Sequence, residues 1–198
     1  MRIILLFLSI LFLTSCVEAV LLTSVKTADI AIRDKTFSDS GKDIAIEAHL
    51  IKDLTLNKLK TPTNMVDITV NEGRVLLTGV VSNEEKAKEA VDIAWKVKNV
   101  KEVIDEIQVV KNFRIFRTSN QYLKDTVITS NIISRLIFTN KISSINYQII
   151  TVNSVVYILG TASSKSEINK VNNISAKARG VNRVVSHLIL RDDKRRRA

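Results

Sequence analysis

The chain has 198 residues, of which 45% are hydrophobic and 25% charged; this is the composition of a folded globular protein, and it excludes wholesale disorder. One Pro, five Gly and one Cys exclude collagen-like segments, an internal disulfide framework and zinc sites built from cysteine pairs. The formal charge of +10 indicates an anionic partner, which is a nucleic acid, a lipid headgroup or a polyanionic cell-wall polymer.

The N-terminus has the pattern of an export signal. Met1-Arg2 is a short basic start, and residues 3–13 follow without a charge. A basic start, an apolar stretch of this length and small residues before a cleavage point are typical of a secretory signal peptide. We therefore expect residues 1–15 to be removed, and we expect no nucleic-acid partner for an exported protein.

The tetrapeptide Leu13-Thr14-Ser15-Cys16 resembles the bacterial lipobox. The resemblance implies cleavage before Cys16 and acylation of that residue by three chains, palmitate among them, which anchor a protein stably. Val17 stands where many Gram-negative lipoproteins retained at the inner membrane have Asp, so the resemblance implies an outer-membrane location facing the periplasm. The alternative is an uncleaved spanning helix over residues 3–25, which are long enough to cross a bilayer but include Glu18.

The rest of the chain is predicted to be a duplicated module. A shift of 81 residues aligns 70–109 with 151–190 without a gap, with seven identities in forty positions and coinciding apolar positions. Such a sustained register indicates an internal repeat. The predicted parts after the signal peptide are a lipidated N-terminus and tether (16–40), a first module (41–110), a linker (111–118), a second module (119–190) and a basic tail (191–198).

The first copy is predicted to run helix, strand, strand, helix, strand. Apolar residues at helical spacing predict a helix over about Asp43–Lys60, which Pro62 ends. Asn71-Glu72-Gly73 is a good hairpin turn. The remaining predicted elements are strands Met65–Val70 and Arg74–Val81, a helix capped by Ser82 or Asn83 and ended by Asn99-Val100, and a closing strand Val103–Val110.

The second copy repeats this order. Its first helix is predicted over about Asp125–Thr139, and Val152-Asn153-Ser154 forms a looser turn between its first two strands. Its second helix is capped by Ser163 or Ser164 and ended by Gly180-Val181, and its closing strand is Arg183–Leu190. The sequence therefore predicts an α+β protein with two tandem modules, each with two helices on a three-stranded mixed sheet.

This arrangement resembles the BON domain. A Gly closes the second strand of each copy (Gly79, Gly160), and Gly180 precedes the last strand of the second copy where the first copy has Asn99. The motifs Val-Leu-Leu-Thr-Gly at 75–79 and Val-Tyr-Ile-Leu-Gly at 156–160 carry the resemblance. Two such modules behind a lipobox resemble the dual-BON-domain outer-membrane lipoproteins of Gram-negative bacteria. The glycines are expected to serve backbone geometry.

No catalytic set emerges from the sequence. His49 and His187 lie at non-equivalent places in the two copies, the glycines form no phosphate-binding loop, and the adjacent acidic pairs lack metal-loop spacing. We therefore expect no enzyme activity, no cofactor and no metal site, and a binding function instead.

The two copies differ sharply in charge. Residues 41–110 hold ten Lys and Arg against twelve Asp and Glu, whereas residues 119–190 hold eight against two. Duplicated folds share a core, so the difference is expected on the surface. A basic module beside a bilayer favours anionic headgroups such as those of phosphatidylglycerol or cardiolipin, at about 1 kcal/mol for each nearby cation. A merely solvated basic surface is the alternative.

The first helix of the second copy is the predicted lipid-binding element. Apolar residues outside its core stripe, rimmed by cations, suit shallow insertion into anionic lipid. The resemblance points the same way, because dual-BON lipoproteins engage anionic phospholipid through this helix. Many relatives have an aromatic residue near the start of the helix, where this chain has Val127. The predicted lipid-binding residues are Lys124, Val127, Ile133, Arg135, Ile137, Phe138 and Lys141.

Two alternatives remain open from the sequence. Ile133, Ile137 and Phe138 either meet lipid or pack against the first module. The protein either binds phospholipid in support of envelope integrity, or acts as a periplasmic adaptor for outer-membrane assembly or cell-wall remodelling machinery.

Overall fold

The computed structural model describes residues 37–110 and 119–196, and the chain from Ser38 onward forms one compact unit. The predicted signal peptide, Cys16, the spanning-helix alternative and the linker lie outside the described residues. Within the described ranges, no helix combines the length and apolar character that a membrane crossing needs.

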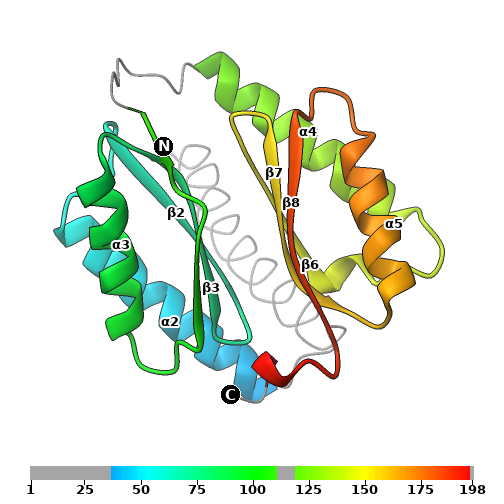
Figure 1. The fold of residues 1–198 in the computed structure, drawn as a ribbon, viewed down its shortest axis with the longest axis horizontal. Coiled ribbons are helices and arrows are strands. Elements are labelled where there is room, and N and C mark those ends of the chain that lie inside the picture. The colour runs from blue at the N-terminus through cyan, green and yellow to red at the C-terminus, as the bar shows by residue number, and fades with distance from the viewer. Residues whose placement is uncertain (1–36, 111–118, 197–198) are drawn as a thin grey trace, which may run out of the picture. The chain divides into compact units, whose positions relative to one another are not determined.

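The α+β fold with two tandem modules is confirmed, and Figure 1 shows both helices of each module on the same face of its sheet. The first module contains α2 (Phe37–Leu56), β1 (Lys60–Thr61), β2 (Asn64–Asn71), β3 (Arg74–Val81), α3 (Glu84–Lys96), β4 (Glu102–Asp105) and β5 (Gln108–Val109). The second contains α4 (Ser119–Ile137), β6 (Tyr147–Val152), β7 (Val155–Ala162), α5 (Lys165–Ala176) and β8 (Arg183–Leu190). Short 3₁₀ turns, Ser144–Asn146 and Lys194–Arg196, precede β6 and follow β8.

Both sheets are mixed. In the first, β2 and β3 form an antiparallel hairpin and β4 and β5 pair with β3 in parallel. In the second, β6 and β7 form the hairpin and β8 pairs with β7 in parallel. The parallel return needs a crossover, which α3 and α5 provide. The second sheet has the three predicted strands, and the first has the two-residue β1 as an additional edge.

Each module has a hydrophobic core between its helices and its sheet. The apolar stripe of α2 (Ile46, Leu50, Leu54) is at most 1% exposed. The corresponding stripe of α4 lies 82 residues further on and is also buried; it consists of Ile128, Ile132 and Leu136. Burial of each such side chain contributes about 1.5–3 kcal/mol, so these stripes fix which face of each helix is left outside.

A third buried cluster contains residues of both sheets. Leu76 and Val80 of β3 lie in it together with Val152, Tyr157 and Leu159 of the second sheet. Side chains alternate between the two faces of a strand, so β3 contributes to this cluster with one face and to the helix-covered core with the other. Burial on both faces explains why β3 is a continuous apolar run.

The predicted end of the first helix is wrong. The helix ends at Leu56, four residues before Lys60, and Pro62 follows β1 instead of ending the helix. Lys58 adopts φ 57°, and the N–H of Leu59 donates to the carbonyl of Leu54 at 2.8 Å. This is the Schellman arrangement, in which a left-handed residue reverses the chain and the following apolar residue covers the last turn; Leu59 is fully buried.

Both first helices also begin earlier than predicted, at Phe37 and Ser119. The two aspartates at the predicted starts bind hairpin turns instead. Asp43 accepts hydrogen bonds at 2.8 Å from the N–H groups of Glu72 and Gly73 in the β2–β3 turn. Asp125 accepts equivalent bonds at 2.9 Å from Asn153 and Ser154 in the β6–β7 turn. These carboxylates hold a hairpin turn against a helix that is already formed.

The closing strand of the first module is interrupted, whereas a single strand was predicted. β4 ends at Asp105 and β5 begins at Gln108, although both keep the same parallel register with β3. The Asp105 carboxylate accepts the N–H of Ile107 at 3.0 Å, so the side chain takes a donor from the backbone at this point. The corresponding strand β8 spans the predicted residues without a break.

The second helix of each module is capped within the predicted dipeptides. The Asn83 side chain accepts from the N–H of Lys86, and Ser164 accepts from the N–H of Glu167. The helices end at Lys96 and Ala176, before the predicted Asn99 and Gly180, which take positive φ in the turns that follow.

Candidate functional site

The outward face of α4 is apolar. Beside its buried stripe, the helix exposes Val127 (68%), Ile133 (40%) and Ile137 (59%), and Phe138 follows its last residue at 88% exposure. Surface patches of this kind indicate an interaction site when they are contiguous. Four of the seven predicted lipid-binding residues therefore lie on one exposed helix face.

The structure adds two residues that the sequence missed. Tyr122 and Leu123 lie in the first turns of α4 and are 54% and 58% exposed. They extend the apolar face toward the helix start and place an aromatic ring five residues before Val127. The sequence analysis missed them because they are exposed and so add no buried position to the apolar stripe from which the helix start was predicted.

The exposure of these residues contradicts the packing alternative. Ile133, Ile137 and Phe138 were weighed as a contact surface for the first module, yet all three are exposed. The contacts with the first module come from the second sheet, as in the hydrogen bond from Gln148 Nε2 to the carbonyl of Val70 at 3.3 Å.

The two acidic residues among residues 119–190 are both buried. Asp125 is 2% exposed and binds the β6–β7 turn, and Glu167 is 5% exposed. Glu167 accepts from the N–H of Ser143 at 2.9 Å and from the N–H of Ser163 at 3.0 Å. Burial by itself raises the pKa of the Glu167 carboxyl, but the hydrogen bonds from Ser163, Ser143 and Tyr147 together lower it below the ordinary value.

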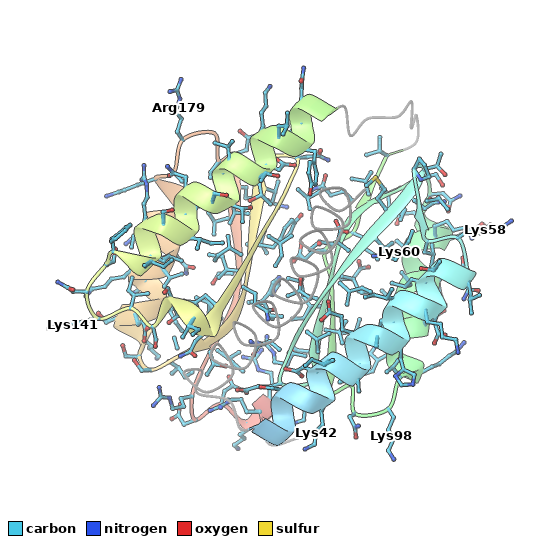
Figure 2. All side chains as sticks on the ribbon, turned by 180° about the vertical axis from the view of Figure 1, so that it is seen from behind. Lys42, Lys58, Lys60, Lys98, Lys141 and Arg179 are labelled. Carbon is cyan, nitrogen blue, oxygen red and sulfur yellow. The ribbon has the colours of Figure 1, made fainter. Side chains whose placement is uncertain are left out.

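The cations of the second module, in contrast, all lie on its surface. The eight Lys and Arg side chains of residues 119–190 are exposed, and none forms an ion pair with a carboxylate in the described parts of the chain. Figure 2 shows two of them, Lys141 and Arg179, pointing away from the module. All charged groups on the surface of this module are therefore basic. The count of eight basic against two acidic residues in the sequence understates this difference.

The predicted cations flank the apolar face. Lys124 and Arg135 are eleven residues apart on α4, which is about three helical turns, so they lie along the same edge of the helix. Lys141 lies in the turn after the helix with φ 65°. The arrangement places apolar side chains beside cations on one helix, as in helices that lie in a membrane interface.

The predicted structural glycines occupy close backbone approaches. At Gly79 a Cβ would lie 1.9 Å from the carbonyl oxygen of Met65, and at Gly160 a Cβ would lie 2.2 Å from that of Asn146. Gly180 has φ 91°. These glycines are needed for the backbone conformation, and they are not part of the exposed apolar face of α4.

His187 contacts a carboxylate of the first module. Its Nε2 lies 3.0 Å from Oε1 of Glu106, and its carbonyl accepts from Arg74 Nη1 at 3.0 Å. Among residues 37–110 and 119–196, no group of three or more His, Cys, Asp or Glu is arranged to hold a metal ion.

Known proteins with similar sequences place the chain in a family. The BON domain matches residues 42–111 and 124–192. A protein of Anaplasma centrale, described as an uncharacterized protein in the gshII 5' region, is 40% identical over 132 residues, which are 67% of this chain and 85% of that protein. The outer membrane lipoprotein DolP of Haemophilus influenzae is 27% identical over 179 residues, or 88% of each chain.

A third relative matches a shorter part. The osmotically-inducible protein Y of Escherichia coli K12 is 27% identical over 125 residues, which are 62% of this chain and 60% of that protein. The domain matches cover more than half of the chain and fall on the two modules described above. The chain therefore belongs to the BON-domain family and carries two copies of the domain.

Proposed function

We propose that this protein binds anionic phospholipid through α4 of its second module and supports the integrity of the cell envelope. The observation that carries the proposal is the exposed apolar face of α4 on a module whose surface has eight cations and no carboxylate. Apolar side chains enter the headgroup region, and cations remain at the level of the phosphates. Neutral lipid provides only the first of these two interactions.

The anchor and the location are part of the same proposal. Acylation of Cys16 tethers the chain at the outer membrane, with both modules facing the periplasm, and the relative named an outer membrane lipoprotein supports this location. Cys16→Ala leaves an unprocessed precursor if the lipobox is read. Unchanged processing and membrane retention in that variant would favour a spanning anchor.

The role is binding and not catalysis. In the described residues the acidic groups of the second module serve its own backbone, and its surface offers cations and apolar side chains. Exposed cations and apolar side chains can bind a partner, and no exposed carboxylate of this module is available as a general base.

Vesicle binding tests the proposal. The protein without residues 1–36 contains both sheets and their cores, and we expect it to float with vesicles that contain phosphatidylglycerol or cardiolipin and not with neutral phosphatidylcholine vesicles. Equal binding to neutral and anionic vesicles, or binding to neither, contradicts the proposal and leaves the adaptor function in its place.

The duplication offers a matched control. Phe138 corresponds to Leu56 at the end of α2, which is 70% exposed in the first module. We expect Phe138→Ser to weaken vesicle binding and Leu56→Ser to leave it unchanged. Circular dichroism checks that both variants keep the fold.

A further inference from the structure

A groove separates the C-terminal ends of α4 and α5 in the second module. Arg135 in the last turn of α4 and Lys177 after α5 line it, with Phe138 and Ile174 as apolar walls. Arg135 Nη1 lies 3.5 Å from the carbonyl of Lys177, which is a long contact that brings the guanidinium across to α5. Ser134 adds a hydroxyl to the lining.

The first module has a groove between α2 and α3 that shares four lining positions with this one. Its lining residues Ile93 and Lys96 occupy the positions of Ile174 and Lys177, and Asp53 occupies the position of Arg135. The equivalence is structural, because the buried stripes of α2 and α4 are 82 residues apart and the capping residues of α3 and α5 are 81 apart.

The charge of the groove is reversed between the copies. Four carboxylates (Asp53, Glu85, Glu89 and Asp92) and two lysines (Lys88 and Lys96) line the groove of the first module, which is therefore net acidic. No carboxylate lines the groove of the second module. The positions equivalent to Glu85, Glu89 and Asp92 hold Ser166, Lys170 and Asn173, which carry no acidic group and lie outside its lining. One scaffold therefore presents an acidic groove in one copy and a basic groove in the other.

The fold itself does not require a cation at position 135. A cation near the end of a helix is favoured by the helix dipole, and this accounts for Lys96 and Lys177 in both copies. Asp53 at the end of α2 has the opposite, unfavourable sign, and the groove is still formed. The helix dipole also favours Arg135 in the last turn of α4, but Asp53 shows that the fold tolerates the opposite charge at this position. The residue is therefore free to serve binding.

We propose that the groove between α4 and α5 binds the phosphodiester of one anionic lipid headgroup, with Arg135 and Lys177 as its ligands and Phe138 beside the glycerol. This inference rests on the proposed function and assigns the contact that makes it selective. A guanidinium and an ammonium from two helices hold a phosphate from two sides, and Arg presents two N–H groups to its oxygens. The acidic groove of the first module repels the same group.

The first experiment compares two charge reversals, one within α5 and one directly after it. Lys177→Glu changes a residue of the groove, and Lys170→Glu makes the same change at an exposed position on α5 outside it. Both alter the net charge equally, so a general attraction to the membrane loses the same amount in each. We expect Lys177→Glu to weaken binding to phosphatidylglycerol vesicles about tenfold and Lys170→Glu to weaken it less than about twofold.

The second experiment uses soluble probes with the protein lacking residues 1–36. We expect glycerophosphoglycerol to shift the amide resonances of residues 134–139 and 174–177, and not those around Asp53 and Lys96. Arg135→Asp, which installs the residue of the first module, should abolish these shifts. Equal shifts with inorganic phosphate at the same concentration would overturn the headgroup assignment, because the groove would then select phosphate alone.

The outcomes separate this inference from the proposed function. Vesicle binding by the unchanged protein with equal losses in Lys177→Glu and Lys170→Glu overturns the groove assignment and leaves the membrane function intact. Saturable shifts with glycerophosphoglycerol in a protein that ignores anionic vesicles support the groove and contradict the membrane function.

Discussion

Arg196 forms a two-point ion pair with Glu72. Its Nε lies 2.6 Å from Oε2 and its Nη2 lies 2.9 Å from Oε1. Glu72 is in the β2–β3 turn, so the pair joins the C-terminal segment to the first module, and Lys101 Nζ donates to the carbonyl of Arg196 at 2.6 Å in the same place. Part of the charge of the segment predicted as a basic tail is thus paired with carboxylates of the same molecule.

Removal of this pair is expected to destabilise the fold. The two side chains are 20% and 8% exposed, so Arg196→Ala leaves a carboxylate with little solvent, and we expect a loss of about 1.5–3 kcal/mol in the free energy of unfolding. Lys194→Ala, at an exposed neighbouring cation, serves as the control and is expected to change stability by less than about 0.5 kcal/mol. Urea unfolding of both variants measures the difference; equal stabilities would mean that the ion pair is not formed in solution.

Replacement of Gly79 by Ala is expected to be strongly destabilising. Its φ of 105° and the carbonyl of Met65 leave no space for a Cβ, so we expect a loss of more than about 2 kcal/mol. Gly41 has no atom within 4 Å of its Cβ position and lies in α2, where Ala stabilises by about 0.5–1 kcal/mol. Thermal unfolding should therefore move in opposite directions for Gly79→Ala and Gly41→Ala, and a similar shift in both contradicts the backbone role of Gly79.

The stability of the second module should fall in acid through Glu167. Its pKa in the folded protein is below the ordinary value of 4.5, so its stabilising contribution is fully present above pH 4.5 and is lost as the pH falls through the lowered pKa. Glu167→Gln removes this linkage and should be less stable at neutral pH, with a flatter profile below pH 4.5. Denaturant midpoints measured across this range test the sign; a steeper acid loss in the variant would show that Glu167 is not the responsible group.

Salt should separate the two parts of vesicle binding. Exposed charges are screened over about 8 Å at physiological ionic strength, whereas apolar contacts are not. We expect Arg135→Glu with Lys141→Glu to remove the salt-sensitive part, and Ile137→Ser with Phe138→Ser to remove the salt-resistant part. Leu123→Ser tests the added turn of α4 and should weaken the salt-resistant part alone, as measured by vesicle flotation at two salt concentrations.

Local signals in the sequence predicted much of the fold. The hairpin turns, the capping dipeptides and the bounds of β8 depend on residues within a few positions of each other, and the structure agrees with them. The start of α4 was missed for a physical reason. Its first residues, among them Tyr122 and Leu123, bury no apolar side chain and so extend no periodic stripe.

The groove between α4 and α5 could not be predicted from the sequence. It depends on which residues of two helices face each other, and Arg135 and Lys177 are separated by 42 positions. The burial of Asp125 and Glu167 was equally inaccessible, because both carboxylates bind backbone groups of distant or preceding loops. The charge count predicted a basic module, and only the structure shows that its surface is free of acidic groups.

The unequal division of charge between the two modules also gives the protein an electric dipole. Residues 41–110 carry ten basic and twelve acidic groups, whereas the surface of residues 119–190 carries basic groups alone. An anionic surface therefore turns the molecule while it is still approaching, before any side chain touches lipid. Orientation during diffusion should make the association rate strongly dependent on ionic strength, while the dissociation rate reports the apolar contacts made after arrival.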